Sequence, residues 1–287
     1  MSIMNFIPEL WAESMIRGLK KKHVFVEDCI TEFQGDLKEM GSKVHVPIFG
    51  GITVTTNAVG DQYKDLPDAE QLSDDQVEVV ADRESKFHFE VSDLDKVQMN
   101  QPLMDAARDD AIYKIADEHD IRVASLAELA TNKTYENPIK VVSGKATDGE
   151  INVLALIDDM ARRMYERSVP VDTKISLTIP YRMWMILRQE LRGVRTDNEQ
   201  ITDNGYVGKV SGLIIRASNN VLRTGTTSAP VDHIMCRTMR AIAFVEQLNK
   251  IKAYEPEKKF TDAVKGISIY GAKIIRPDEL EVAEITY

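Results

Sequence analysis

The chain has 287 residues, 43% of them hydrophobic, which is enough to bury one large core or two modest ones. Its net charge of −10 argues against a dedicated nucleic-acid reader, because such proteins carry a basic face, but it is compatible with a protein that merely encloses nucleic acid. No apolar run approaches the about 20 residues that a membrane-spanning helix needs. The cysteines, Cys29 and Cys236, are far apart in the chain, so two free thiols in a reducing compartment are expected.

The first 34 residues are predicted to form an arm that contains a helix. Between Pro8 and Lys22 the apolar residues recur at roughly helical spacing. Trp11 is costly to leave in water, so we expect it to pack on the same chain or on a neighbouring copy. The basic cluster at 20–22 follows the apolar part, which is the reverse of the order in a secretory signal, so no export is expected.

Residues 35–99 carry strand patterns around a polar, acidic stretch at 57–76. The strand patterns occupy residues 43–48, 52–56, 77–79 and 86–91. Together they predict a long two-stranded arm with a solvated acidic tip, and Pro47 suggests an edge strand. A two-stranded ribbon is only marginally stable alone in water, and long loops are unusual in a compact domain. The arm therefore needs a partner surface, which is a first indication of an assembly subunit.

Residues 101–130 are predicted to form the helix around which the chain is organised. The segment contains no glycine, and its only proline, Pro102, falls in the first turn, where a helix tolerates it. At about 1.5 Å per residue the helix would be about 45 Å long, which is long for a domain of this size. Apolar residues and one histidine recur at spacings of three and four and define the expected core stripe. They are Met104, Ala107, Ala111, Ile115, His119, Val123, Leu126 and Ala130.

The second half of the chain mixes helices and strands. Thr147 and Glu150 have capping-box spacing, which predicts that a helix over 151–167 begins there. A second helix is expected over 181–191 and carries Trp184, and residues 192–208 are predicted to form an exposed polar loop. Strands are expected over 174–179, 210–217, 234–236, 241–245 and 267–275. The predicted fold class is α+β.

The sequence lacks the common catalytic and ligand-binding motifs. It has no phosphate-binding glycine loop, no nucleophile elbow and no H-E-x-x-H zinc motif, and no two of its five histidines lie within four residues of each other. We therefore predict no catalytic, cofactor-binding or metal-binding residue. The arm, the acidic hairpin and the rod-like helix all offer surface to neighbours, which favours an assembly protein over an enzyme. The candidate contacts between copies are Trp11, Asp61, Tyr63, Asp65, Asp74, Asp75, Asp197 and Glu199.

Several short sequence segments, spread over nearly the whole chain, carry a family resemblance. They are FIPELW at 6–11 with VFV at 24–26, GSKVHVP at 41–47, FHFEVSDLDKVQ at 87–98, IP at 179–180 ahead of a helix, and AFVEQ at 243–247 followed by Tyr254, KG at 265–266 and YGAK at 270–273. In these short segments and in the order of its predicted elements, the chain resembles the major capsid proteins of tailed double-stranded DNA bacteriophages. Their shell fold is shared with encapsulins.

The resemblance implies a named part for each segment. Residues 1–34 would be the N-terminal arm, 35–98 the extended loop with its flanking strands, and 99–149 the peripheral domain with the spine helix. Residues 150–228 would be the axial domain, and 229–287 would supply strands that complete the peripheral and axial domains. The implied function is self-assembly into an icosahedral head around the double-stranded DNA genome.

The implied partners are many copies of the chain itself, arranged as pentamers and hexamers, together with scaffolding, portal and decoration proteins. Packaged DNA would be contacted non-specifically, and no cofactor and no membrane are expected. The implied location is the virion, with assembly in the host cytoplasm. Many family members carry a long N-terminal scaffolding segment, whereas this sequence starts almost directly at the arm. A separate scaffolding protein, none at all, or a segment already removed would each explain that difference, and Met1 argues against removal.

Three other interpretations remain open at this stage. An encapsulin-type nanocompartment shares the shell fold but encloses an enzyme cargo. A soluble α+β enzyme with an unrecognised site would form a small oligomer and contain a pocket with perturbed titratable groups. A tail or adaptor protein would form rings or tubes instead of closed shells.

Overall fold

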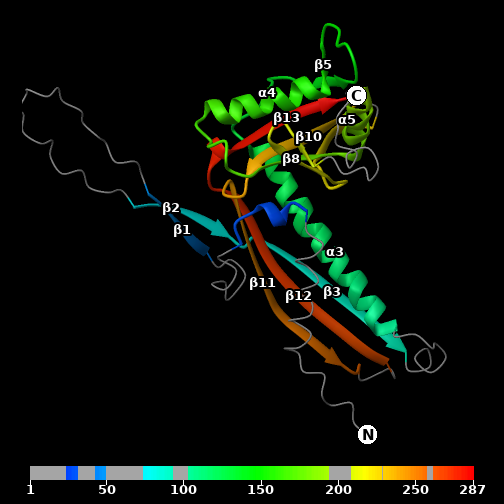
Figure 1. Cartoon of the computed structure of the whole chain (residues 1–287). Coiled ribbons are helices and arrows are strands. Elements are labelled where there is room, and N and C mark those ends of the chain that lie inside the picture. The colour runs from blue at the N-terminus through cyan, green and yellow to red at the C-terminus, as the bar shows by residue number, and fades with distance from the viewer. Residues whose placement is uncertain are drawn as a thin grey trace, which may run out of the picture.

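The computed structural model describes residues 24–31, 43–49, 74–92, 103–193, 208–227, 229–256 and 261–287. An eight-stranded sheet with two helices forms one end of the molecule, and a three-stranded sheet with one long helix forms the other (Figure 1). A separate two-stranded ribbon projects to the side. The mixture confirms the α+β class. Among the helices of the described ranges, none combines the length and apolar character that crossing a membrane requires.

The eight-stranded sheet has the order β5-β4-β13-β10-β6-β8-β7, with β9 paired to β10. Its strands are β4 (Ile139–Val142), β5 (Glu150–Asn152), β6 (Ile175–Ile179), β7 (Lys209–Val210), β8 (Leu213–Ala217), β9 (Arg223–Thr226), β10 (Ala229–Thr238) and β13 (Leu280–Thr286). Helices α4 (Val153–Glu166) and α5 (Tyr181–Gly193) share a hydrophobic core with it. β6 is buried at all five positions, as expected for a central strand covered on both faces.

Helix α4 begins later than the capping-box spacing predicts. Thr147 and Glu150 do interact, with the Thr147 hydroxyl donating to the Glu150 carboxylate at 2.6 Å, but Glu150 starts strand β5. The N-cap is Asn152, whose side-chain oxygen accepts a hydrogen bond from the Leu154 backbone N–H at 2.8 Å. The expected start at residue 151 is therefore wrong by two positions, because Asn152 satisfies a free N–H of the first turn.

The three-stranded sheet joins segments that are distant in sequence. Its order is β11-β12-β3, with β11 spanning Ile242–Tyr254, β12 spanning Thr261–Ile274 and β3 spanning Arg83–Ser92. We expected β3 to belong to the two-stranded arm, and this is wrong, because β3 pairs along its whole length with β12. Its predicted alternation is correct: Phe87 and Phe89 are half-buried, whereas His88 and Glu90 are exposed.

Helix α3 (Leu103–Ser125) lies along the three-stranded sheet and ends in a 3-10 turn, η2 (Leu126–Leu129) (Figure 1). The predicted long helix is therefore confirmed over its described residues. From Ile115 onward every member of the expected stripe is buried. The fully buried His119 ring packs against Phe244 and Tyr270, with centroid distances of 5.3 and 4.3 Å. Met104 and Ala107 lie outside the residues whose burial is described.

The two-stranded ribbon consists of β1 (Lys43–Phe49) and β2 (Asp74–Val80). Its antiparallel register pairs Lys43 with Val80 at the base and Phe49 with Asp74 at the outer end. At the base, Val44 and Val79 pack in a small core with Ala243 of β11 and Ile269 of β12. The rest of the ribbon points away from the body (Figure 1). The predicted hairpin arm is thus present, built from β1 and β2.

Candidate assembly surfaces

Residues 24–31 form a short segment with a 3-10 turn, η1 (Val26–Asp28), that is fastened to the body by Asp120 of α3. The Asp120 carboxylate accepts hydrogen bonds from the backbone N–H groups of Val24, Phe25 and Val26 at 3.1, 3.2 and 3.5 Å. Burial raises the pKa of this carboxyl to about 6, because the three N–H groups and the nearby Arg237 only partly replace its hydration. A charged group on the helix thereby fixes where the N-terminal part of the chain joins the body.

Arg237 of β10 fastens the same segment from the sheet side. Its side chain is fully buried, and its guanidinium donates to the Phe25 carbonyl at 2.6 Å and to the Cys29 sulfur at 3.4 Å. The Phe25 ring lies 5.4 Å from the guanidinium carbon, which adds a cation–π contact. A buried cation that loses such partners is strongly unfavourable, so Arg237 is an anchor of this junction.

Two further contacts complete the junction. Arg216 of β8 forms ion pairs with Glu27 and Asp28, the latter at 3.2 Å. Ile30 bridges to β11, donating to the Ile242 carbonyl at 2.9 Å and accepting from the Phe244 N–H at 3.0 Å. The segment therefore bonds to α3, β8, β10 and β11, and it links both sheets.

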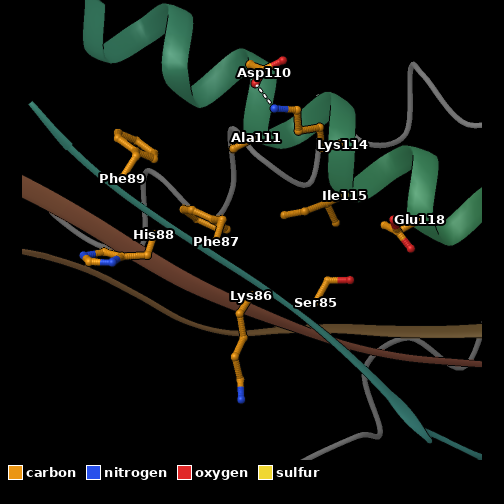
Figure 2. A pocket seen from close by; sticks show the side chains of 10 residues that line it. All are labelled: Ser85, Lys86, Phe87, His88, Phe89, Asp110, Ala111, Lys114, Ile115 and Glu118. Atoms are coloured by element: carbon orange, nitrogen blue, oxygen red, sulfur yellow. Dashed lines mark ion pairs between the residues drawn. The ribbon is translucent and has the colours of Figure 1, made fainter.

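A groove of about 530 Å³ separates α3 from β3 (Figure 2). Phe87 and Phe89 face the helix, where Ile115 contributes apolar surface, while Lys86 and His88 point to the opposite face of the sheet (Figure 2). The rim carries Glu118 and an ion pair between Asp110 and Lys114 at 2.7 Å. The groove offers apolar contact area bounded by charges.

The described residues contain no arrangement for metal binding: no group of three or more His, Cys, Asp or Glu side chains there is suited to hold an ion. Both cysteines are free and buried. Burial raises the pKa of the Cys29 thiol and of the Cys236 thiol, and a thiol that stays protonated is a poor nucleophile. These two side chains behave as packing residues.

Of the predicted contact residues, the structure places Asp74 and Asp75 at the outer end of the ribbon, where they pair with Phe49 and Ile48 of β1. These two acids begin strand β2, although the sequence pattern places them in the polar stretch before it. The remaining predicted contact residues lie outside the described ranges. They are Trp11, Asp61, Tyr63, Asp65, Asp197 and Glu199.

No protein-family model matches the chain, and no curated protein matches its sequence. Solved structures match its fold. A structure of Mycobacterium phage Che8 is 21% identical with a TM-score of 0.67, and the alignment covers 98% of both chains. The capsid structure of cyanophage P-SCSP1u is 15% identical with a TM-score of 0.63, covering 90% of this chain and 85% of that one. This chain has the phage capsid fold.

The capsid fold also extends to a virus-like particle from Pyrococcus furiosus, which is 12% identical with a TM-score of 0.54. That alignment covers 96% of this chain and 98% of the other. The three alignments cover 98%, 90% and 96% of this chain, so the fold match is not confined to one sheet or one helix. Asp120 and Arg237, which sequence reasoning missed, hold the N-terminal junction within this capsid fold.

Proposed function

We propose that this chain is a major capsid protein that assembles into an icosahedral head around double-stranded DNA. The observation that carries the proposal is the fold match to the Che8 structure over 98% of both chains. The projecting β1–β2 ribbon supports it, because a two-stranded ribbon gains stability by packing on a further surface. In this proposal the role of the chain is structural, and no catalytic step is assigned to it.

The proposed parts follow the segment order. Residues 1–34 act as the arm, 35–98 as the extended loop with its flanking strands, 99–149 as the peripheral domain with α3, and 150–228 as the axial domain, with 229–287 completing both domains. Pentamers and hexamers form the shell, and scaffolding, portal and decoration proteins are further proposed partners. One structural relative is a satellite phage P4 procapsid that includes a size determination protein. Assembly in the host cytoplasm and placement in the virion complete the proposal.

The test is assembly of the purified chain, followed by light scattering and negative-stain electron microscopy across a salt series. With a net charge of −10, copies repel one another, and salt screens that repulsion over a Debye length of about 10 Å at 0.1 M. We expect closed particles whose threshold concentration falls as salt rises. A protein that stays monomeric or dimeric at every salt concentration, with and without co-expressed scaffolding protein, contradicts the proposal.

A shell that encloses a protein cargo is the second candidate, because the chain also matches a virus-like particle over 98% of that chain and the fold alone does not specify what a shell encloses. The two candidates differ in what fills the shell. Particles purified from the native source should contain nuclease-protected DNA if the chain is a phage head protein. A stoichiometric co-purifying protein without DNA would favour the cargo shell.

A further inference from the structure

Helix α5 carries two large apolar side chains on its solvent-facing side. Its inner side chains, Met183 and Leu187, are fully buried in the core that the helix shares with the eight-stranded sheet. Tyr181 and Met185 are 50% and 57% exposed. Four residues apart on a helix, they lie on the same face and form one continuous patch.

Aromatic rings and arginines lie beside this patch and contact one another. The Tyr181 ring meets the half-buried Trp184 ring edge-on at 6.5 Å. The guanidinium of Arg188 lies 5.6 Å from the Trp184 ring, and that of Arg182 lies 4.4 Å from the Tyr287 ring. No described carboxylate forms an ion pair with either guanidinium. Each of these two positive charges therefore lies beside an aromatic ring near the exposed side of α5.

The composition of this patch is that of an interface hot spot. Tyr, Trp, Arg and Met are the residues enriched at the centres of protein interfaces, where rigid side chains supply contact area at low entropic cost. Helix α5, which carries the patch, lies at the end of the eight-stranded sheet where the C-terminus is found (Figure 1). It is separate from the α3–β3 groove and from the β1–β2 ribbon.

The charge balance of the chain favours a second copy as the partner. The chain holds 46 Asp and Glu against 36 Lys and Arg, so a second copy carries a net negative charge, which a patch that displays arginines attracts locally even though whole copies repel one another. We propose that the α5 patch, formed by Tyr181, Arg182, Met185 and Arg188, is the hot spot of a contact with a second copy of this chain. This inference rests on the proposed shell function and assigns one of its interfaces.

The test compares the double variant Tyr181→Ala/Met185→Ala with Val171→Ala. Val171 is 79% exposed and follows α4, so its truncation also removes exposed apolar surface but leaves the aromatic–arginine cluster intact. We expect the double variant to raise the threshold concentration for particle formation at least about tenfold, as truncation of hot-spot residues does. Val171→Ala should leave the threshold unchanged, and both variants should melt as unassembled wild-type subunits do.

The outcomes separate this inference from the proposed function. Wild-type particles together with an unchanged threshold for the double variant overturn the inference and leave the shell function standing. A large fall in the melting temperature of the unassembled double variant also overturns it, because Tyr181 and Met185 would then stabilise their own chain. A wild-type chain that never assembles removes the shell function and this inference together.

Discussion

Asp120 couples the stability of the folded chain to pH. Burial raises the pKa of its carboxyl from an ordinary 3.8 to about 6, so the folded chain holds this proton more tightly than the unfolded chain. The stabilisation of the folded chain by this bound proton is fully present below pH 3.8 and is lost as the pH rises to about 6. At about 1.4 kcal/mol per pKa unit, the free energy of unfolding of wild type relative to Asp120→Asn should fall by up to about 3 kcal/mol between pH 4 and 7. Urea denaturation of unassembled subunits across this range measures the change.

A matched control for Asp120 is Glu118, an exposed carboxylate on the same helix. Glu118→Gln should show the same pH dependence as wild type to within about 0.5 kcal/mol. A pH-independent difference between wild type and Asp120→Asn would show that the backbone N–H groups of residues 24–26 compensate the buried charge completely.

Single buried charges are the part of the junction that sequence patterns do not predict. Asp120 lies 95 residues from Phe25, and Arg237 lies 212 residues from it, so no local pattern links them. On a helix that carries many charges, residue type alone does not distinguish the buried carboxylate from its solvated neighbours. The one available signal is position, because Asp120 adjoins His119 on the expected core stripe. Only the tertiary fold shows that it receives three N–H groups.

At the scale of elements, two glycines of β12 predict unequal responses to the same substitution. A Cβ at Gly271 would lie 2.1 Å from the Val80 carbonyl oxygen, which is backbone at the end of β2. A Cβ at Gly266 would lie 2.2 Å from the Phe87 ring, which borders the α3–β3 groove and has space to move. Gly271→Ala should therefore cost about 3 kcal/mol and Gly266→Ala about 1 kcal/mol, within the range for overpacking.

Thermal melting of unassembled subunits measures both variants against wild type. Equal losses of stability for the two variants would mean that the backbone at the contact between β2 and β12 shifts as readily as the Phe87 side chain. A stabilising effect of Gly271→Ala would contradict the close approach of the two backbones. Without that contact, alanine should stabilise the strand relative to glycine.

Most elements follow from local pattern, whereas strand partners do not. The periodicity of α3, the apolar face of α4 and the alternation of β3 are all visible in the sequence. The partner of β3 is not, because Ser85 pairs with Ser268, far along the chain. Strand β13 escapes sequence-based prediction because acids interrupt its apolar pattern. One of them, Glu281, is fully buried and is neutralised by Arg167 at 2.7 Å and by a hydrogen bond from Thr134 at 2.9 Å.

At the scale of the whole molecule, the contacts that fold the chain and those proposed for assembly lie in different places. The base of the β1–β2 ribbon packs on β11 and β12, whereas Phe49 and Asp74 at its outer end pair with each other. Among the residues whose burial the structure describes, no member of the cores of the two larger sheets comes from that outer end. Assembly can therefore be weakened there without unfolding the subunit. Of the predicted contact residues, Asp74 and Asp75 begin β2 at this outer end, and Asp61, Tyr63 and Asp65 lie between β1 and β2 in the sequence.

Replacing residues 50–73 by Asn-Gly tests this separation. Phe49 and Asp74 are directly paired, so a two-residue turn can close the hairpin with its register intact. We expect the shortened chain to melt within a few degrees of wild-type subunits, because the packed base of the ribbon is kept. Its particles should be few or absent in electron micrographs, since the weakening of one interface in every copy is multiplied over a closed shell. Normal shells from the shortened chain would contradict the role of 50–73 as the extended loop, and a large loss of melting temperature would place that loop in the chain's own core.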